Sequence, residues 1–415
     1  MNTANTRRFA LVAMLILVCS GLAAEPRGTA PLVRQFDRIA ALESPSKSNR
    51  QTIELRAGRR TWTLQLEDHA ALIGRLPSQA RAGLARGGAR FLRGNVEGLE
   101  NSWARLNWID GRWSGAVFDG NELWLIDRAD RLGLEQRSRA SDAVLFRMAD
   151  LAIEQFIDHG GITVPGAQPP PARRKAAPAT DYRTFASHLR EIVALQGTAM
   201  MALPITIVTD THFTEDFPGN ELAITLGRIN FIDGIYSDQV GVGITLWHHE
   251  PLKSANVMTA SDANQLLSEF GEFMNGAGSE IPFSGLAHLF TGRPRDGSTA
   301  GIAYLFPDQT ATVICRRLDG MGVVWTLASE TTSSLVFAHE VGHNFNARHD
   351  DVTDPKDPAA CPEGTFRGIM NSFLRQDTPQ QFSQCSLNAM LPTLAGVSCL
   401  VNIEDLFADG FETTP

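Results

Sequence analysis

The chain has little positive charge, few cysteines and no long apolar run beyond its first residues. Its net charge is -9 and its pI is about 5.6, so no electrostatic feature suggests a nucleic-acid partner. No polybasic patch suggests a membrane surface. Beyond the N-terminus no segment is apolar enough to predict a transmembrane helix, and we expect no stable membrane association. The composition, 43% hydrophobic and 20% charged, is that of an ordinary soluble protein of two or three domains.

The N-terminus has the pattern of a secretory signal peptide. Two arginines precede an apolar run from Phe9 to Val18, and small residues follow at Gly21 and Ala23. An uncleaved membrane anchor is the alternative, but the run is short for a full span. We therefore predict a signal peptide over residues 1–24 and a secreted protein, which is extracellular or in transit through a periplasm.

Four cysteines remain once the segment with Cys19 is removed. They all lie in the last quarter of the chain, at Cys315, Cys361, Cys385 and Cys399. An even number in an exported protein predicts two disulfides, and spacing alone leaves three connectivities open. A cysteine metal site is disfavoured because no CxxC spacing occurs, and free thiols are the remaining alternative.

The chain divides into regions of different pattern. Residues 25–165 alternate apolar and polar side chains between Gly and Asp-Gly turns, which predicts a β-rich domain built as a meander. Residues 166–180 form a Pro/Arg-rich linker. Its Arg173-Arg174-Lys175 is either a processing site or a plain solvated stretch. Residues 181–402 alternate helix and strand patterns, and the acidic tail, 403–415, is most simply a frayed end.

One string of residues carries most of the functional information. His339 and His343 lie four apart on a helix predicted over 329–345, so both imidazoles can reach one metal ion. Glu340 can contact a metal-bound water without being a ligand. His349 lies too far along a straight helix, so the chain must turn. Asn346 suits that turn because Asn tolerates positive φ. A helix that carries His on its polar face by chance is the alternative.

These residues resemble a known family. The string from His339 to Asp350 is similar to the zinc-binding motif of the metzincin peptidases, and Asp350 resembles the adamalysin (reprolysin, ADAM-like) branch. Gly368-Ile369-Met370-Asn371 resembles the Met-turn, and the segments 289–292 and 296–304 resemble the substrate-binding strand. Residues 91–98 resemble the propeptide of that branch. The resemblance covers roughly residues 50 to 402.

The resemblance implies a fold and a site. It implies an α+β metzincin catalytic domain over 181–402, with a mixed, mostly parallel sheet and an active-site helix, preceded by a β-rich propeptide over 25–165. Peptide substrate would lie antiparallel to an edge formed by Gly301, Ile302 and Ala303. The family pairs a cysteine before the active-site helix with one near the domain end. This implies the bonds Cys315–Cys399 and Cys361–Cys385.

The implied activity is that of a secreted zinc endopeptidase made as a zymogen, with protein or peptide substrates. One zinc held by His339, His343 and His349 would activate a water, and Glu340 would act as general base. Met370 would form an apolar floor beneath the metal. A catalytically inactive secreted binding protein on the same scaffold is the alternative, and a metal-dependent hydrolase of a non-peptide substrate is a third.

Three departures from the family pattern bear on regulation and metals. Residues 25–314 contain no cysteine, which excludes a cysteine switch. The propeptide would then inhibit its own enzyme sterically or through another ligand. Asn346 replaces the usual Gly at the turn. The calcium site is only partly matched, because Asn402 fits but Pro204 and Gly285 stand where acidic ligands are expected, so we do not predict calcium.

Overall fold

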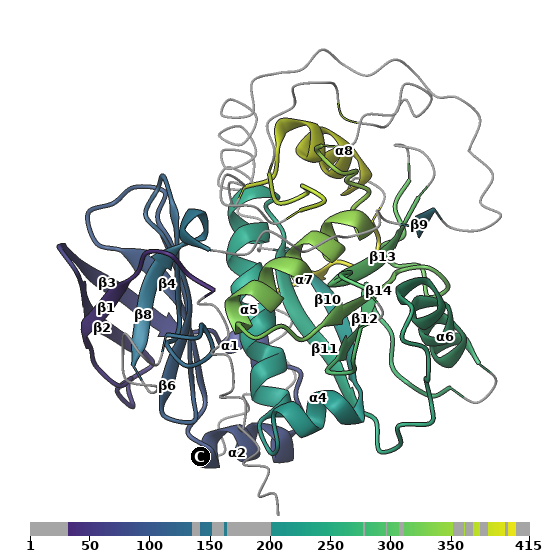
Figure 1. Cartoon of the computed structure of the whole chain (residues 1–415), viewed down its shortest axis with the longest axis horizontal. Coiled ribbons are helices and arrows are strands. Elements are labelled where there is room, and N and C mark those ends of the chain that lie inside the picture. Colours follow the sequence, from purple (N-terminus) through teal and green to yellow (C-terminus); the bar gives the residue numbers. More distant parts are fainter. Residues whose placement is uncertain are drawn as a thin grey trace, which may run out of the picture. The chain divides into compact units, whose positions relative to one another are not determined.

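A computed structural model describes most of the chain after the N-terminus (Figure 1). The described residues are 32–134, 142–151, 162–163, 201–276, 279–295, 297–306, 311–351, 361, 368–373, 381–394 and 397–403. All of them belong to one compact unit. The predicted signal peptide, the predicted linker and nearly all of the predicted tail lie outside them. Within the described residues no helix is both long and apolar enough to cross a membrane.

The N-terminal region is a closed antiparallel barrel. Each strand pairs with the next, and the last pairs with the first. The strands are β1 (Asp37–Leu42), β2 (Arg50–Ala57), β3 (Arg60–Asp68), β4 (Arg90–Val96), β5 (Trp103–Ile109), β6 (Arg112–Phe118), β7 (Leu123–Arg128) and β8 (Ala143–Arg147). Side chains alternate along them, so Leu55, Leu64 and Leu106 fill the interior. The strand prediction is confirmed here, whereas the closure of the barrel was not predicted.

Short helices and tight turns join the barrel strands. Helices α1 (Ala70–Ile73) and α2 (Ser78–Arg86) connect β3 to β4, and the 3-10 turn η1 (Met148–Asp150) follows β8. Asp110 and Gly111 have φ angles of 52° and 72°, as a two-residue hairpin between β5 and β6 requires. The predicted Asp-Gly turn is therefore present at this position.

The second region contains a mixed sheet in the order β11-β10-β12-β14-β13-β9, and β15 pairs with β10. The strands are β9 (Ile162–Thr163), β10 (Met201–Thr209), β11 (Gly243–Pro251), β12 (Leu286–Thr291), β13 (Gly301–Leu305), β14 (Met321–Trp325) and β15 (Val401–Asn402). The pairs among β11, β10, β12 and β14 are parallel, and β13 pairs antiparallel with β14.

Helices cover both faces of this sheet (Figure 1). Helices α5 (Glu221–Gln239) and α7 (Glu330–Asn344) lie on one face and α6 (Ala263–Asn275) lies on the other. The region also contains the helices α4 (Thr211–Asp216) and α8 (Gln384–Leu394). Alternate strand residues face opposite sides. Phe290 therefore belongs to the core shared with α5 and α7, while Leu289 belongs to the core shared with α6.

Candidate active site

Helix α7 begins at a well-formed cap. The Ser329 hydroxyl accepts a hydrogen bond from the Thr332 amide at 3.2 Å, and Glu330 lies in the first turn, where the helix dipole favours a negative charge. Ser329 acts as the cap because its backbone is still extended, with φ at -101° and ψ at 132°. The helix is buried along nearly its whole length.

The chain turns sharply just after α7. Asn346 has a φ of 78°, which confirms the predicted left-handed turn. The amide of Ala347 donates to the carbonyl of Gly342 at 3.0 Å, which closes the helix end. The Asn346 side chain accepts a hydrogen bond from the Phe306 amide at 3.1 Å. The side chain that permits the turn therefore also ties it to the end of β13.

The turn brings three imidazoles together. One ligand atom from each of His339, His343 and His349 lies within 4.8 Å of the others, and the three rings are buried. The Nε2 atoms of His339 and His349 are 3.2 Å apart. Among the described residues this is the one cluster of His, Cys, Asp and Glu able to hold a metal. The donor set suits zinc, and three imidazoles leave a coordination position open.

Backbone carbonyls fix the tautomers of two of these rings. His339 Nδ1 lies 2.8 Å from the Ile369 carbonyl, and His343 Nδ1 lies 2.8 Å from the Ala347 carbonyl. A carbonyl only accepts, so each Nδ1 carries the proton and each Nε2 presents its lone pair to the centre of the cluster. Without a cation these adjacent lone pairs repel one another. The arrangement therefore favours binding of a metal ion.

Glu340 is fully buried beside the cluster. Gly301 on β13 lies directly against it, since a Cβ added there would lie 2.2 Å from Glu340 Oε1. The Tyr236 hydroxyl donates to the Ala338 carbonyl at 2.8 Å and braces the same turn of α7. Burial raises the pKa of Tyr236 well above its usual value, and the charge of Glu340 adds to this effect.

Met370 is fully buried and lies against Gly342, which falls between the first two histidines of the helical motif. A Cβ added to Gly342 would lie 2.4 Å from its Sδ, so the glycine in the helical motif makes room for the methionine. The Asp350 amide donates to the Met370 carbonyl at 2.8 Å. The Met370 segment and the segment after His349 are thereby joined through the backbone.

The Asp350 carboxylate holds the surrounding loops together. It accepts hydrogen bonds from the Gly368 amide at 2.7 Å, from the Ser386 hydroxyl at 2.9 Å and from the Ser383 hydroxyl. Burial raises the pKa of Asp350, and these hydrogen bonds oppose the shift. The sequence marked Asp350 only as a family feature, without a role. Its structural role is to fasten the Met370 turn to the start of α8.

One buried residue near the site was missed by the sequence analysis. The Asn344 amide donates to the carbonyls of Tyr304 and Met321 at 2.8 and 3.1 Å, and its oxygen lies 2.8 Å from His288 Nε2. The last turn of α7 is therefore tied to β13 and β14. An Asn on a fully buried helix was the available signal, because a buried amide needs partners.

Strand β13 borders the cluster. Gly301, Ile302 and Ala303 pair with β14 on one side, and among the described residues no strand pairs with these three on the other side. The next two residues of the edge, Tyr304 and Leu305, pair in parallel with Ile162 and Thr163 of β9. Within the part of the chain that the structure describes, the edge predicted for substrate is thus unpaired at Gly301, Ile302 and Ala303 and paired with β9 at its last two residues.

The four cysteines and one pair of neighbouring histidines outside the cluster are placed as follows. Cys315 is bonded to Cys399 and Cys361 to Cys385, which is the pairing that the resemblance implied. His248 and His249 find separate partners: His248 Nε2 lies 3.0 Å from Glu250, and His249 Nε2 lies 3.1 Å from the Thr209 hydroxyl. They do not converge on a common point.

Comparison with known proteins locates the similarity in the second region. Residues 201–383 match the family model for Metallo-peptidase family M12, of the reprolysin type. Zinc metalloproteinase barnettlysin-1 of Bothrops barnetti is 27% identical over 156 residues, which are 37% of this chain and 67% of that protein. Snake venom metalloproteinase atroxlysin-1 of Bothrops atrox is 28% identical over 153 residues, with the same coverage. The overall likeness to the crystal structure of metalloproteinase-II from Bacteroides fragilis is low. It has 11% identity and a TM-score of 0.45 over 83% of this chain and 92% of that one.

Proposed function

Because residues 201–383 belong to the reprolysin type of metzincin zinc metalloendopeptidases, we propose that the chain is an exported endopeptidase synthesised as a zymogen. The main support for the proposal is that His339, His343 and His349 converge beside the buried Glu340. In it the three imidazoles are the zinc ligands and Glu340 is the general base. The presence of Glu340 speaks against an inactive binding protein, because a purely structural metal has no use for that carboxylate.

The chemistry divides between metal and protein. Bound zinc supplies Lewis acidity, which polarises the scissile carbonyl and acidifies the attacking water. Glu340 takes the proton from that water and passes it to the leaving amine. Burial of the carboxylate keeps bulk water from competing for the same proton. The Nδ1 contacts of His339 and His343 hold the rings in the tautomer that can bind a cation.

The substrate is a protein or peptide, because a strand edge beside the cluster, unpaired among the described residues, suits an extended main chain. We propose that the substrate adds antiparallel along Gly301, Ile302 and Ala303, with backbone hydrogen bonds that are independent of side-chain identity. Gly301 lies against Glu340, so the scissile bond would meet the carboxylate at this point of the strand.

Latency is proposed to depend on the segment before residue 201. Residues 25–165 would form the propeptide, 166–180 the processed linker and 181–402 the mature α+β domain. The pairing of Ile162 and Thr163 with the β13 edge supports steric inhibition, because β9 occupies the continuation of the proposed substrate path. Without a thiol in residues 25–314 a thiolate cannot block the zinc. The N-terminal pattern and the disulfides support export.

Hydrolysis of casein or gelatin tests this function. We expect cleavage that a chelator abolishes, that added zinc restores and that Glu340→Ala removes while one zinc per chain remains. A processed protein that holds zinc but cleaves no protein or peptide would contradict it. Glu250→Ala is a matched control, because that carboxylate contacts His248 away from the cluster and should leave activity unchanged.

A further inference from the structure

We propose that the barrel stays bound to the metallopeptidase domain after the linker is cut, as a lasting part of the enzyme. This inference rests on the proposed function, in which the linker is cut. Four features of the contact between the barrel and helices α5 and α7 support it: a two-sided helix, a set of buried polar pairs, a capping carboxylate and the filling of the contact.

Helix α5 needs packing partners on two of its sides. Fourteen of its nineteen residues are buried, and α7 and β11 cover only part of its surface. Gly227 and Gly234 lie two turns apart on the side that meets β5. A Cβ at Gly234 would lie 2.5 Å from the Trp103 ring, and one at Gly227 would lie 3.2 Å from Asn107 Nδ2. The glycines thus admit barrel side chains close to the helix backbone.

Polar side chains from the two parts satisfy each other in this contact. Arg105 of the barrel donates to Asp233 of α5 at 2.8 Å, and both side chains are nearly inaccessible to solvent. Asn230 of α5 donates to Asn107 at 2.8 Å and contacts His69 Nδ1 at 2.8 Å. Burial alone would raise the pKa of Asp233, but Arg105, His69 and hydrogen bonds outweigh it and lower the pKa. The contact therefore favours the charged carboxylate.

A barrel carboxylate also caps the active-site helix. Asp127 of β7 is 1% exposed and accepts hydrogen bonds from the Ser329 hydroxyl at 2.7 Å, the Thr331 amide at 3.2 Å and the Thr331 hydroxyl at 3.1 Å. The last two groups belong to the first turn of α7, where an acidic group also interacts favourably with the helix dipole. Loss of the barrel would remove this cap from the helix that carries His339, Glu340 and His343.

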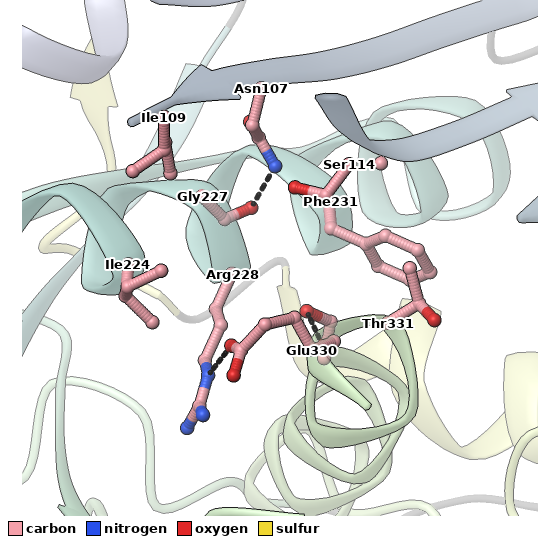
Figure 2. Close-up of a pocket in the computed structure, with 11 residues that line it drawn as sticks. Asn107, Ile109, Ser114, Ile224, Gly227, Arg228, Phe231, Glu330 and Thr331 are labelled. Atoms are coloured by element: carbon pink, nitrogen blue, oxygen red, sulfur yellow. Dashed lines mark hydrogen bonds and ion pairs between the residues drawn. The ribbon is translucent and has the colours of Figure 1, made fainter. Parts of the chain in front are cut away.

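The contact is closely filled. Figure 2 shows Asn107 pointing from the barrel to Gly227, with Arg228 and Glu330 paired beside it. The cavity left at this place is about 10 Å³, room for roughly one water molecule. Apolar side chains on the outside of the barrel, such as Phe91 and Leu125, belong to the same buried cluster as Ile229 and Val336 of α5 and α7. A well-packed contact with a continuous apolar cluster is typical of lasting association.

The barrel contacts and the catalytic residues lie at different places on α7. Asp127 meets its first turn, whereas His339 comes eight residues after Thr331, about 12 Å farther along the axis. The segment paired with the substrate edge is β9, and not the barrel. Cutting the linker would leave β9 held at one end only, so substrate could displace it while the barrel stays in place.

Size-exclusion chromatography after a single cut tests the proposal. A recognition site for a specific protease replaces residues 171–176 of the full chain, in the Glu340→Ala background so that the readout does not depend on activity. No disulfide crosses the cut, because Cys315, Cys361, Cys385 and Cys399 all lie after it. We expect both pieces to elute together at micromolar concentration, neutral pH and physiological salt. Separate elution under these conditions would overturn the proposal.

Two variants and one activity assay sharpen the test. Asp127→Ala should weaken the association of the two pieces at least about tenfold, because three buried donors lose their acceptor. Glu67→Ala removes a half-exposed barrel carboxylate paired with Arg93 and should leave the association unchanged. Equal dissociation constants for the two variants would overturn the part assigned to Asp127. With Glu340 intact, proteolytic activity should elute with the two-piece complex; activity only in barrel-free fractions would count against the proposal.

Discussion

Gly301→Ala is predicted to impair catalysis without removing the metal. The added methyl would lie 2.2 Å from Glu340 Oε1 and 2.7 Å from its Cδ and Cγ, whereas ordinary contact begins at 3.4 Å. Glu340 must therefore move by about 1 Å, and full burial leaves it little room. A misplacement of about 1 Å lowers the rate about 100-fold, equivalent to about 2.7 kcal/mol in the activation barrier.

The assay is kcat on an extended peptide, with zinc content and the thermal midpoint measured alongside. We expect kcat to fall about 100-fold while one zinc per chain is retained. Gly271→Ala is the matched control, because its nearest neighbour, Met321 Sδ, is 4.0 Å from the added methyl. A Gly301→Ala enzyme with wild-type kcat would refute the reasoning. So would an equal loss in both variants.

Three further results are expected. Asn346→Val should displace His349 and weaken zinc binding, because a β-branched residue opposes a φ of 78°, whereas Asn346→Gly should retain the metal; zinc titration compares them. Burial chiefly lowers the pKa of His69 from 6.5 to about 4, with Asp233 opposing and Arg105 adding to the shift. The folded state therefore disfavours the protonated ring, and up to about 3 kcal/mol of stability should be lost between pH 6.5 and 4. Denaturant unfolding of wild type and His69→Gln should show a smaller loss in the variant. Chelation should lower the thermal midpoint and zinc should restore it, because a ligand stabilises the state that binds it.

The metal cluster could be predicted because the residues that form it lie close together in the sequence. The spacing of His339 and His343 follows from helix geometry, and the need for a turn before His349 follows from its distance along the chain. Asn346 could be identified as the turn residue because few residues other than Gly tolerate positive φ. The edge expected at residues 301–303 likewise lies in a strand, β13.

The parts that the sequence did not predict depend on partners far away in the chain. Closure of the barrel requires β1 to meet β8, and no local pattern specifies that pairing. Asp127 and Ser329 are 202 positions apart, so neither position indicates the contact. Strand β11 runs from Gly243 to Pro251 alongside β10, and this pairing rather than local pattern decides its bounds. Gly301 could be placed on the substrate edge, but its close approach to Glu340 is a matter of packing.

X-ray absorption at the zinc edge, measured on the full chain and on His349→Ala, tests the central claim most directly. We predict one zinc per chain, with three imidazole nitrogens and one oxygen at about 2.0–2.1 Å in the wild type and one imidazole fewer in the variant. An identical spectrum for the two proteins, or a sulfur ligand in either, would contradict the account.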